Sequence, residues 1–374
     1  MNFLAGVRVL DLSRYLPGPY ATHILCEMGA EVVKVEEPIT GDPMRVLPPV
    51  VDGTSWAFQA LNAGKKSVEL DLKSPDAAAA ILRLATSSHV FVETFRPGVA
   101  KRLGVDYEAV RAASPSIVYC SLTSYGQTGP MRDAPGHDIN FVGLAGLLSL
   151  GPLPGITVAD LAGGLMASTT IVGALKGGRG AYIDLSLSDT MLSWLQIEAA
   201  HAFAGLRHAE ADVDAAAQAG ERDGGPMSGF LGGAAAWYRA YDTKDGARIS
   251  VGAIEPKFWA ELCARLGKAE FTDVQFERDA QPRAAEAFAS VFRTATLDDW
   301  MKRLDGLPVA PVLALADAVA HPQFTGRGLV EEFVAEATPL RRIAFPPRIS
   351  PGPVGSAVPR RAPALGEHTR EFLG

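Results

Sequence analysis

The chain is poor in several features that mark particular classes of protein. Its three cysteines, Cys26, Cys120 and Cys263, are odd in number, far apart and never in a CxxC pair. That usage supports neither a disulfide framework nor a zinc site, and small buried thiols are the expected state. Gly, Pro or charged residues interrupt the apolar stretches short of the roughly 20 residues that a membrane span needs, so we expect no membrane partner.

The charge pattern argues against a nucleic acid partner. The net charge is −7, and the chain has no basic run and no Lys/Arg patch interleaved with aromatic residues, so no nucleic acid partner is expected. The first residues, Met1–Arg8, lack the charged-then-apolar layout of a signal peptide, and the last four are not a peroxisomal address. These features together predict a cytoplasmic protein.

Length and composition predict two domains, since 374 residues of which 48% are hydrophobic can bury a sizeable core. In the first part, short apolar runs alternate with helical patterns, which predicts an α/β domain with a parallel sheet. The expected strands are residues 7–12, 31–36, 67–72, 89–93, 117–122 and 182–186. The expected helices are residues 20–28, 76–86, 97–103, 160–175 and 187–205.

The pattern changes near residue 206. Residues 206–236 are rich in Ala, Gly and charge with little periodicity, which is typical of a linker. A hairpin with an Asp245-Gly246 turn and three helical patterns follow, and they predict a smaller α+β domain. Those helices are expected at 255–266, 283–294 and 297–304, and the proline-rich tail, 331–374, as extended chain. The predicted division is a large domain of residues 1–205 and 328–374 and a small domain of residues 237–327.

The first β-α-β unit lacks both common phosphate-binding signatures. Neither G-x-G-x-x-G nor a P-loop is present, and Ser13–Pro19 occupies the first strand-to-helix turn. Basic side chains nevertheless gather at expected strand ends and helix starts, where ligands of open α/β sheets bind. They are Arg14, Lys65, Lys66, Arg96, Lys101 and Arg102. Each alone is typical of a solvated surface charge, but six together indicate a ligand with several phosphates.

His137 and Asp160 are the strongest candidates for chemistry. His137 lies in the stretch Gly136–Phe141, and Asp160 follows 23 residues later, before a glycine-rich run. An imidazole and a carboxylate presented from glycine-rich turns can supply an acid and a base to a small substrate. Each also has an ordinary structural role, because an Asp before a helix is commonly an N-cap.

Several stretches of the sequence resemble the family III coenzyme A transferases, and within them the α-methylacyl-CoA racemases. The resemblance runs from about residue 4 to residue 330. The stretches on which the resemblance is based are Gly18-Pro19, 31–38, 62–67 with 70–73, 95–99, 125–130, 136–140, Ala159-Asp160 and 251–258. Any one of them is weak evidence, but the set is specific.

The resemblance implies a coenzyme A (CoA) thioester substrate, bound by a large domain with a Rossmann-like sheet. It also implies an interlocked homodimer whose active site joins the large domain of one subunit to the small domain of the other. The positions that match the nucleotide contacts are Lys65 and Arg102, with Arg14 and Arg96 as weaker matches. No metal is implied, and no cofactor beyond the CoA moiety of the substrate.

Residues at three matching positions carry the proton transfer in the racemases: His137, Asp160 and Glu255. Inverting an α-carbon next to a thioester needs a base on one face, an acid on the other and stabilisation of the enolate oxygen. A neutral His137 oriented by Glu255 would serve one face and Asp160 the other. Amides near Asp160, or in the Gly163-Gly164 turn, are candidate oxyanion donors. Asp138 is expected to be a structural partner of His137 or of a nearby amide.

We therefore predict a 2-methylacyl-CoA racemase. The transferases instead use the Asp as a nucleophile that becomes acylated, and they generally lack His at the position of His137. A CoA-transferase acting between an acyl-CoA and a carboxylate, with Asp160 as nucleophile, is the alternative. A protein that binds CoA esters without chemistry is a third hypothesis.

Three departures from the racemases bear on the substrate. The stretch between His137 and Asp160 is several residues shorter, Ala63 stands where an Arg is usual, and Phe141 replaces a Tyr. The shorter stretch borders the expected acyl pocket, so the acyl group is predicted to differ from a long branched chain.

Overall fold

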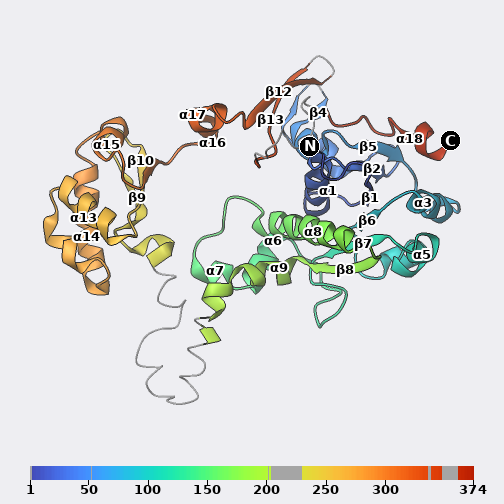
Figure 1. The fold of residues 1–374 in the computed structure, drawn as a ribbon, viewed down its shortest axis with the longest axis horizontal. Helices are drawn as coiled ribbons and strands as arrows, with labels where there is room; N and C mark the ends of the chain where they lie inside the picture. Colours follow the sequence, from blue (N-terminus) through green and yellow to red (C-terminus); the bar gives the residue numbers. More distant parts are fainter. Residues whose placement is uncertain (1, 52, 201, 204–229, 336–337, 348–360) are drawn as a thin grey trace. The chain divides into compact units, whose positions relative to one another are not determined.

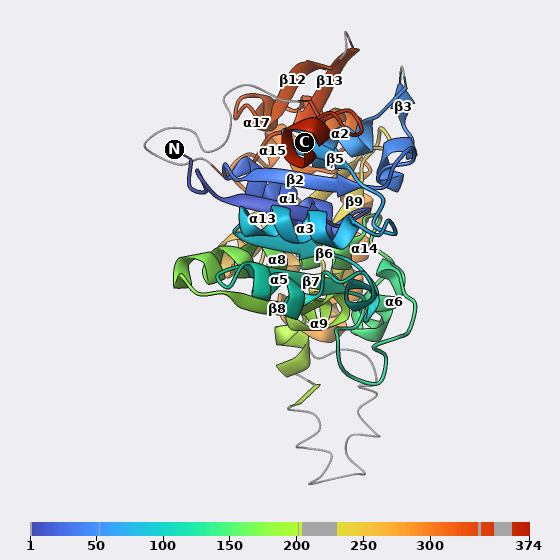
Figure 2. The same ribbon diagram turned by 90° about the vertical axis from the view of Figure 1, so that its right-hand side faces the viewer.

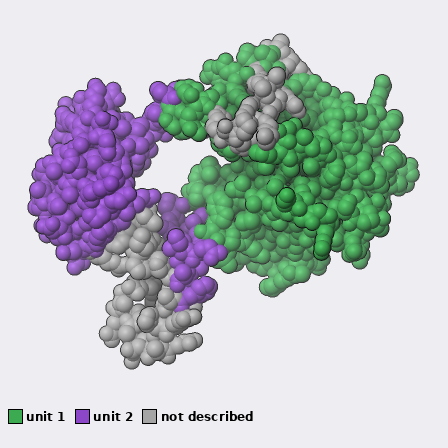
Figure 3. All heavy atoms as spheres, viewed as in Figure 1, with its two compact units in different colours: residues 1–145, 153–194, 323–374 green, residues 146–152, 195–322 purple. Residues whose placement is uncertain are grey.

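The chain forms two compact units, which Figure 3 colours separately. The computed structural model describes residues 2–51, 53–200, 202–203, 230–335, 338–347 and 361–374. Unit 1 comprises residues 1–145, 153–194 and 323–374, and unit 2 comprises residues 146–152 and 195–322. The division thus falls at 194/195 and 322/323, where the sequence suggested 205 and 327/328.

A six-stranded parallel sheet forms the centre of unit 1, as the sequence predicted (Figure 2). Its strands are β1 (Arg8–Leu12), β2 (Glu31–Glu36), β5 (Lys66–Glu69), β6 (Val90–Glu93), β7 (Val118–Thr123) and β8 (Ala181–Ser186). They lie in the order β5-β2-β1-β6-β7-β8. Strands β2 and β5 therefore lie on one side of β1, and strands β6, β7 and β8 lie on the other. We call the position between β1 and β6 the strand reversal. In sheets of this kind, ligands bind beyond the carboxyl ends of the strands at that reversal.

Helices cover both faces of the sheet (Figure 1). One face carries α1 (Pro17–Glu27) and α8 (Val158–Gly177), and the other carries α3 (Ala77–Thr86) and α5 (Tyr107–Ala113). Apolar side chains of the strands interdigitate with Ile81 and Leu84 of α3, all of them buried. The shorter elements of this unit are η1 (Pro43–Val46), β3 (Val50–Val51), β4 (Thr54–Ser55), α2 (Trp56–Asn62), α4 (Val99–Arg102), α6 (Asp138–Leu144) and α9 (Leu187–Trp194).

Two glycines bring backbone segments close to one another on the α1 face. A Cβ at Gly18 would lie 2.2 Å from the Cβ of Ser13, and one at Gly164 would lie 2.7 Å from the carbonyl oxygen of Pro17. Any larger residue would therefore push α1 away from the β1 turn or from α8.

A buried ion group joins β1, β2 and α1. The Nζ of Lys34 lies 2.8 Å from Asp42 Oδ2 and donates to the carbonyl of Ser13 at 2.7 Å. Asp11 accepts hydrogen bonds from Ser13 and Thr22, and its side chain is fully buried. Burial alone would raise the pKa of Asp11, but the positive charges of Lys34 and Lys65 hold it below its usual value.

Unit 2 is the small α+β domain that the sequence predicted. Its antiparallel sheet has the order β11-β10-β9, and the hairpin is confirmed as β9 (Tyr238–Asp242) and β10 (Arg248–Gly252). The third strand, β11 (Val309–Pro311), was not predicted. Its helices are α7 (Leu147–Leu150), α13 (Pro256–Arg265), α14 (Gln281–Phe292), α15 (Leu297–Arg303) and α16 (Leu315–Ala320), with helical turns η2 (Phe230–Ala234), η3 (Ala269–Val274) and η4 (Arg278–Ala280).

The tail is not wholly extended chain, so that prediction is wrong. After α17 (Pro322–Thr325), strands β12 (Val330–Ala335) and β13 (Thr338–Ile343) pair as an antiparallel hairpin, and α18 (Thr369–Leu373) ends the chain. The N–H of His368 donates to the carbonyl of Ser67 at 2.8 Å, so this end of the tail pairs with β5 at the edge of the sheet. Residues 348–360 of the tail and 206–229 of the predicted linker lie outside the described residues.

In the described part of the chain, α8 is long and apolar enough to cross a membrane by length and composition, and 39% of its most apolar window is buried. The sequence did not indicate this length, because its interior glycines interrupt the apolar residues without ending the helix. Length and composition are weak evidence here, since α8 packs against α1, β7 and β8 within unit 1.

The buried ion group makes a stability prediction. Replacing Lys34 by Met would leave Asp11 and Asp42 buried with less compensating charge, so the free energy of unfolding should fall by about 3–5 kcal/mol. Urea unfolding measures the change, and Lys101→Met, at an exposed position of α4, is the matched control. Equal urea midpoints for the two variants would show that the ion group contributes nothing.

Candidate active site

The loops that follow β1 and β6 meet at the reversal of strand order. The backbone N–H of Arg14 donates to Thr94 Oγ1 at 3.1 Å, which joins the two loops. The side chain of Arg14 lies 3.9 Å from Glu37 and is 42% exposed. Arg96, in the loop after β6, and Arg102, at the end of α4, are exposed. The structure therefore brings Arg14 and Arg96 to the carboxyl ends of the central strands β1 and β6, and it leaves their side chains accessible to solvent.

Lys65 does not share that position, so its contact with the nucleotide stays a prediction. Its side chain is fully buried. Its Nζ lies 2.7 Å from Thr22 Oγ1, 2.9 Å from Asn62 Oδ1 and 3.0 Å from the carbonyl oxygen of Pro19. These acceptors use all three N–H donors of the ammonium group, so Lys65 stabilises the interior. Burial lowers its pKa to about 8, although Asp11 opposes the change.

His137 is the N-cap residue of α6 and is exposed. Its backbone N–H donates to Asn140 Oδ1 at 3.0 Å, which closes the first turn of the helix. The preceding Gly136 leaves room for Tyr125, because a Cβ there would lie 2.6 Å from the tyrosine hydroxyl. Tyr125 also packs edge-to-face on Phe141 at 5.4 Å between ring centroids. These contacts fix the backbone that carries the imidazole.

Asp138 joins this segment to the start of α8. Its carboxylate is buried, and Oδ1 accepts the backbone N–H of Asp160 at 3.0 Å. The expectation that Asp138 is a structural partner of a nearby amide is therefore confirmed. Because Asp138 follows His137 directly, this hydrogen bond brings the segments of both candidate residues together.

Asp160 lies in the first turn of α8 and is partly buried. Burial, with a smaller contribution from the neighbouring charge of Asp138, raises the pKa of its carboxyl to about 7. At neutral pH, Asp160 can therefore give or take a proton.

The glycines after Asp160 are not oxyanion donors, contrary to one expectation. Gly163 and Gly164 lie inside α8, where backbone N–H groups donate to carbonyls four residues earlier. Both are buried, and a Cβ at Gly163 would lie 2.2 Å from Leu187. Their smallness serves packing against α1 and α9.

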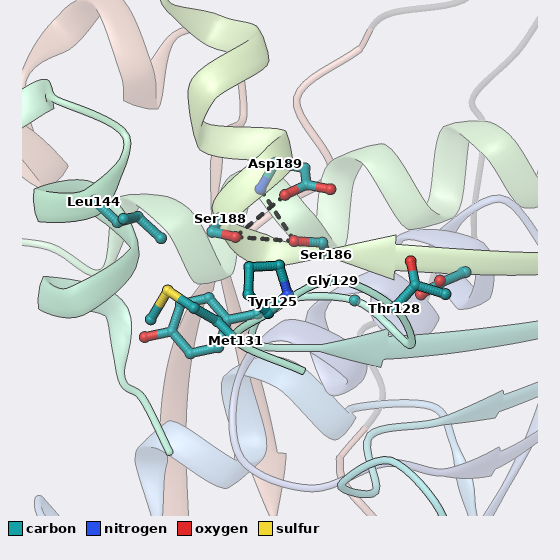
Figure 4. A pocket seen from close by; sticks show the side chains of 11 residues that line it. Tyr125, Thr128, Gly129, Met131, Leu144, Ser186, Ser188 and Asp189 are labelled. Carbon is teal, nitrogen blue, oxygen red and sulfur yellow. Dashed lines mark hydrogen bonds between the residues drawn. The ribbon is translucent and has the colours of Figure 1, made fainter. Parts of the chain in front are cut away.

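A groove of about 330 Å³ lies beside α6, at the carboxyl ends of β7 and β8. Figure 4 shows Tyr125 and Met131 facing Ser186 and Ser188, with Leu144 and Thr128 at opposite ends. The hydroxyl oxygens of the two serines lie 3.0 Å apart, and the N–H of Asp189 donates to Ser186 Oγ at 3.1 Å. The sequence analysis missed this groove. Its local signal is the set of polar residues Ser186, Ser188 and Asp189 at a strand end.

Glu255 belongs to unit 2, so its partnership with His137 stays a prediction. It is the N-cap residue of α13, is exposed and makes no side-chain capping hydrogen bond. Pro256 follows it at the first position of the helix. Among the residues that the structure describes, no three His, Cys, Asp or Glu side chains form a group that could hold a metal ion.

A doubly wound sheet with exposed basic side chains on its loops, together with a partly buried carboxyl whose pKa is raised to about 7, is typical of α/β enzymes. The sequence model of CoA-transferase family III matches residues 4–369. The chain belongs to that family, whose members are enzymes that act on CoA thioesters as transferases or racemases.

Relatives of both kinds are similar to this chain. A succinyl-CoA:glutarate CoA-transferase of Mus musculus is 32% identical over 100% of this chain and 86% of its own. The α-methylacyl-CoA racemase of Homo sapiens is 31% identical over 99% and 92%. The crystal structure of a CAIB/BAIF family protein from Brucella suis is 28% identical, with a TM-score of 0.79 over 99% of this chain and 98% of that one.

The hydrogen bond between Asp138 and Asp160 generates a prediction. Asp138→Asn keeps an acceptor for the Asp160 N–H but removes a charge, so the pKa of Asp160 should fall. It should stay above 3.8, because burial remains. Carbon-13 NMR titration of labelled aspartate, assigned by loss of the signal in Asp160→Asn, measures it. In the control Asp133→Asn, whose side chain is 76% exposed, the titration should not move. An unshifted Asp160 in Asp138→Asn would contradict the assigned cause.

Proposed function

We propose that this protein is an acyl-CoA racemase or epimerase, which inverts the α-carbon of a 2-methylacyl-CoA thioester. The observation that carries the proposal is an Asp160 carboxyl with a pKa of about 7, tied through Asp138 to the segment of His137. An acid/base group transfers protons best when its pKa lies near the working pH. The residue combination also resembles racemases more than transferases, because His137 is present.

Each residue has a stated part in the proposed reaction. His137 takes the α-proton from one face of the thioester, and Asp160 returns a proton to the other. The first-turn amides of α8 and its N-terminal dipole stabilise the enolate oxygen. Glu255 orients the imidazole, as the resemblance implies. The reaction needs no cofactor beyond the CoA moiety of the substrate.

We propose that Arg14, Arg96 and Arg102 hold the phosphates of CoA. Arg14 and Arg96 stand at the strand reversal, and a guanidinium group binds phosphate oxygens through two parallel hydrogen bonds. Arg96 and Arg102 are exposed and the side chain of Arg14 is partly exposed, so an incoming anion has access to all three. Lys65 is left out of the proposed contacts because its donors are used inside the fold.

CoA transfer is the second candidate, and the relatives taken alone favour it over racemisation. Succinyl-CoA:glutarate CoA-transferases precede the racemases in similarity, although the identities differ by one percentage point or less. In that reaction the ionised Asp160 attacks the thioester carbonyl and displaces CoA as its thiolate, which leaves the acyl group on Asp160 as a mixed anhydride. Near a pKa of about 7 the anion is populated as well, so the carboxyl suits this role too.

Incubation of one enantiomer of 2-methylbutanoyl-CoA in deuterated water distinguishes the two. The racemase should incorporate deuterium at the α-carbon and lose optical purity, read by mass spectrometry and chiral chromatography. Asp160→Asn and His137→Gln should each lower the exchange rate by at least about 100-fold, whereas Asp133→Asn should not.

Other outcomes of these experiments would contradict the racemase proposal. No α-exchange with any branched, aryl or dicarboxylic acyl-CoA would overturn the racemase. Formation of glutaryl-CoA from succinyl-CoA and glutarate, with a hydroxylamine-trapped Asp160 and an active His137→Gln variant, would establish the transferase. CoA binding without either reaction would leave a binding protein.

We also propose that the protein is a homodimer. Three adjacent helices of unit 1 expose large apolar side chains at 37–57%, which is typical of an interaction surface. They are Ile139 and Leu144 of α6, Leu165 and Met166 of α8, and Leu192 and Trp194 of α9. The family resemblance implies an interlocked arrangement of two copies.

Light scattering tests the homodimer. The mass should be twice the 39.5 kDa of the chain, and Leu165→Glu with Leu192→Glu should yield monomer or fail to assemble. The control Ile39→Glu, at a position 92% exposed outside these helices, should remain a dimer. A wild-type protein that elutes as a monomer at micromolar concentration would contradict the proposal.

A further inference from the structure

Glu93 is a buried carboxyl that the proposed reaction does not use. It is the last residue of β6, at the strand reversal, and is 2% exposed. Its Oε2 accepts the backbone N–H of Phe95 at 2.6 Å. Phe95 stands beside Arg96, so the carboxyl of Glu93 anchors the loop that carries one of the proposed phosphate contacts.

The same carboxyl connects to a second loop through β7. Glu93 is paired in register with Ser121 on the neighbouring strand, so the two side chains lie next to each other on one face of the sheet, and the interaction with Ser121 lowers the pKa of Glu93. Ser121 Oγ in turn accepts the side-chain N–H of Gln127 at 3.0 Å. The backbone N–H of Gln127 donates to both carboxylate oxygens of Asp184, at 3.0 and 3.1 Å, so this loop is held from two sides.

The second loop reaches the proposed acid/base pair. Its Tyr125 packs against Gly136 and Phe141, on either side of His137 and Asp138. A continuous series of contacts therefore runs from the loop after β6, through Glu93 and Ser121, to the backbone that presents the imidazole.

We propose that Glu93 is a positioning residue that holds the loop receiving CoA and the loop supporting His137 in one arrangement. This inference rests on the proposed function for its catalytic consequence. Its structural half, the coupling of the two loops, does not. Glu93 touches neither substrate nor reacting atoms in this scheme and acts through Ser121, Gln127 and Phe95.

The surroundings of Glu93 make the coupling depend on pH. Burial, together with the charge of Asp184 on β8, raises the pKa of Glu93 to about 7, against the opposing interactions with Ser121 and with the backbone N–H of Phe95. Burial also raises the pKa of Tyr119, Cys120 and Tyr182, so these neighbours on β7 and β8 stay neutral. Glu93 has a pKa near neutral pH, unlike Tyr119, Cys120 and Tyr182, and its ionised form is the stronger hydrogen-bond acceptor.

Two variants interrupt the series of contacts at different points. Glu93→Gln keeps the shape but removes the ionised acceptor, so amide hydrogen exchange should quicken at least about threefold in both loops, 94–98 and 124–130. Ser121→Ala leaves the Phe95 contact intact, so exchange should quicken in 124–130 alone. Glu108→Gln, at an exposed glutamate of α5, is the matched control and should change neither loop.

Calorimetric titration with CoA between pH 6 and 8 supplies the functional readout. Wild-type affinity should weaken as Glu93 becomes protonated below pH 7, whereas Glu93→Gln should bind about tenfold more weakly at pH 8 and with little pH dependence. Ser121→Ala should bind CoA normally but slow α-proton exchange.

The outcomes separate this inference from the proposed function. Unchanged hydrogen exchange in 124–130 of both variants overturns the positioning role, whatever the protein binds. Wild-type affinity and pH dependence in Glu93→Gln overturn it as well, while leaving the racemase proposal standing. A wild-type protein that binds no CoA refutes the proposed function, and the exchange data then decide the coupling by themselves. If Glu93→Gln does not fold, Ser121→Ala still tests it.

Discussion

The reversal of strand order between β1 and β6 is the constraint on which the site depends. Because successive connections run in opposite directions from this point, the loops after the two strands meet beyond their carboxyl ends, where ligands of such sheets usually bind. Arg14 and Arg96 stand on these loops, and the hydrogen bond from Arg14 to Thr94 holds the loops together. The fold thus places two arginines beyond the carboxyl ends of β1 and β6, without a glycine-rich phosphate loop.

The parallel sheet could be predicted from sequence because each of its strands is a local apolar run, and the strands found lie at or within a few residues of those expected. The buried position of Lys65 could not be predicted from sequence. A lysine at the start of a strand gives the same local pattern whether its side chain points to solvent or into the interior. Its three acceptors come from α1 and α2, which only the folded chain brings together. The hairpin of the tail was missed for a similar reason, because the prolines beyond it concealed the strand pattern.

The candidate site was predictable to the extent that its residues lie in recognisable stretches. His137 and Asp160 were found in that way, but the hydrogen bond from Asp160 to Asp138 spans 22 residues and has no local signal. Glu93 and the serines of the groove carry no motif of their own. Their position follows from strand register, which pairs Glu93 with Ser121 and sets Ser121 beside Asp184.

The two chemistries of the family make opposite demands on Asp160. A nucleophile must be ionised when the thioester arrives, whereas a proton donor must be protonated at the moment the enolate collapses. Burial and the charge of Asp138 place the carboxyl between these demands, with both forms populated at neutral pH. A higher pKa makes the remaining anion a stronger nucleophile but less abundant, so the carboxyl alone does not select the reaction. A second proton carrier would therefore select racemisation, and the exposed imidazole of His137 at the N-terminus of α6 is the group proposed for that part.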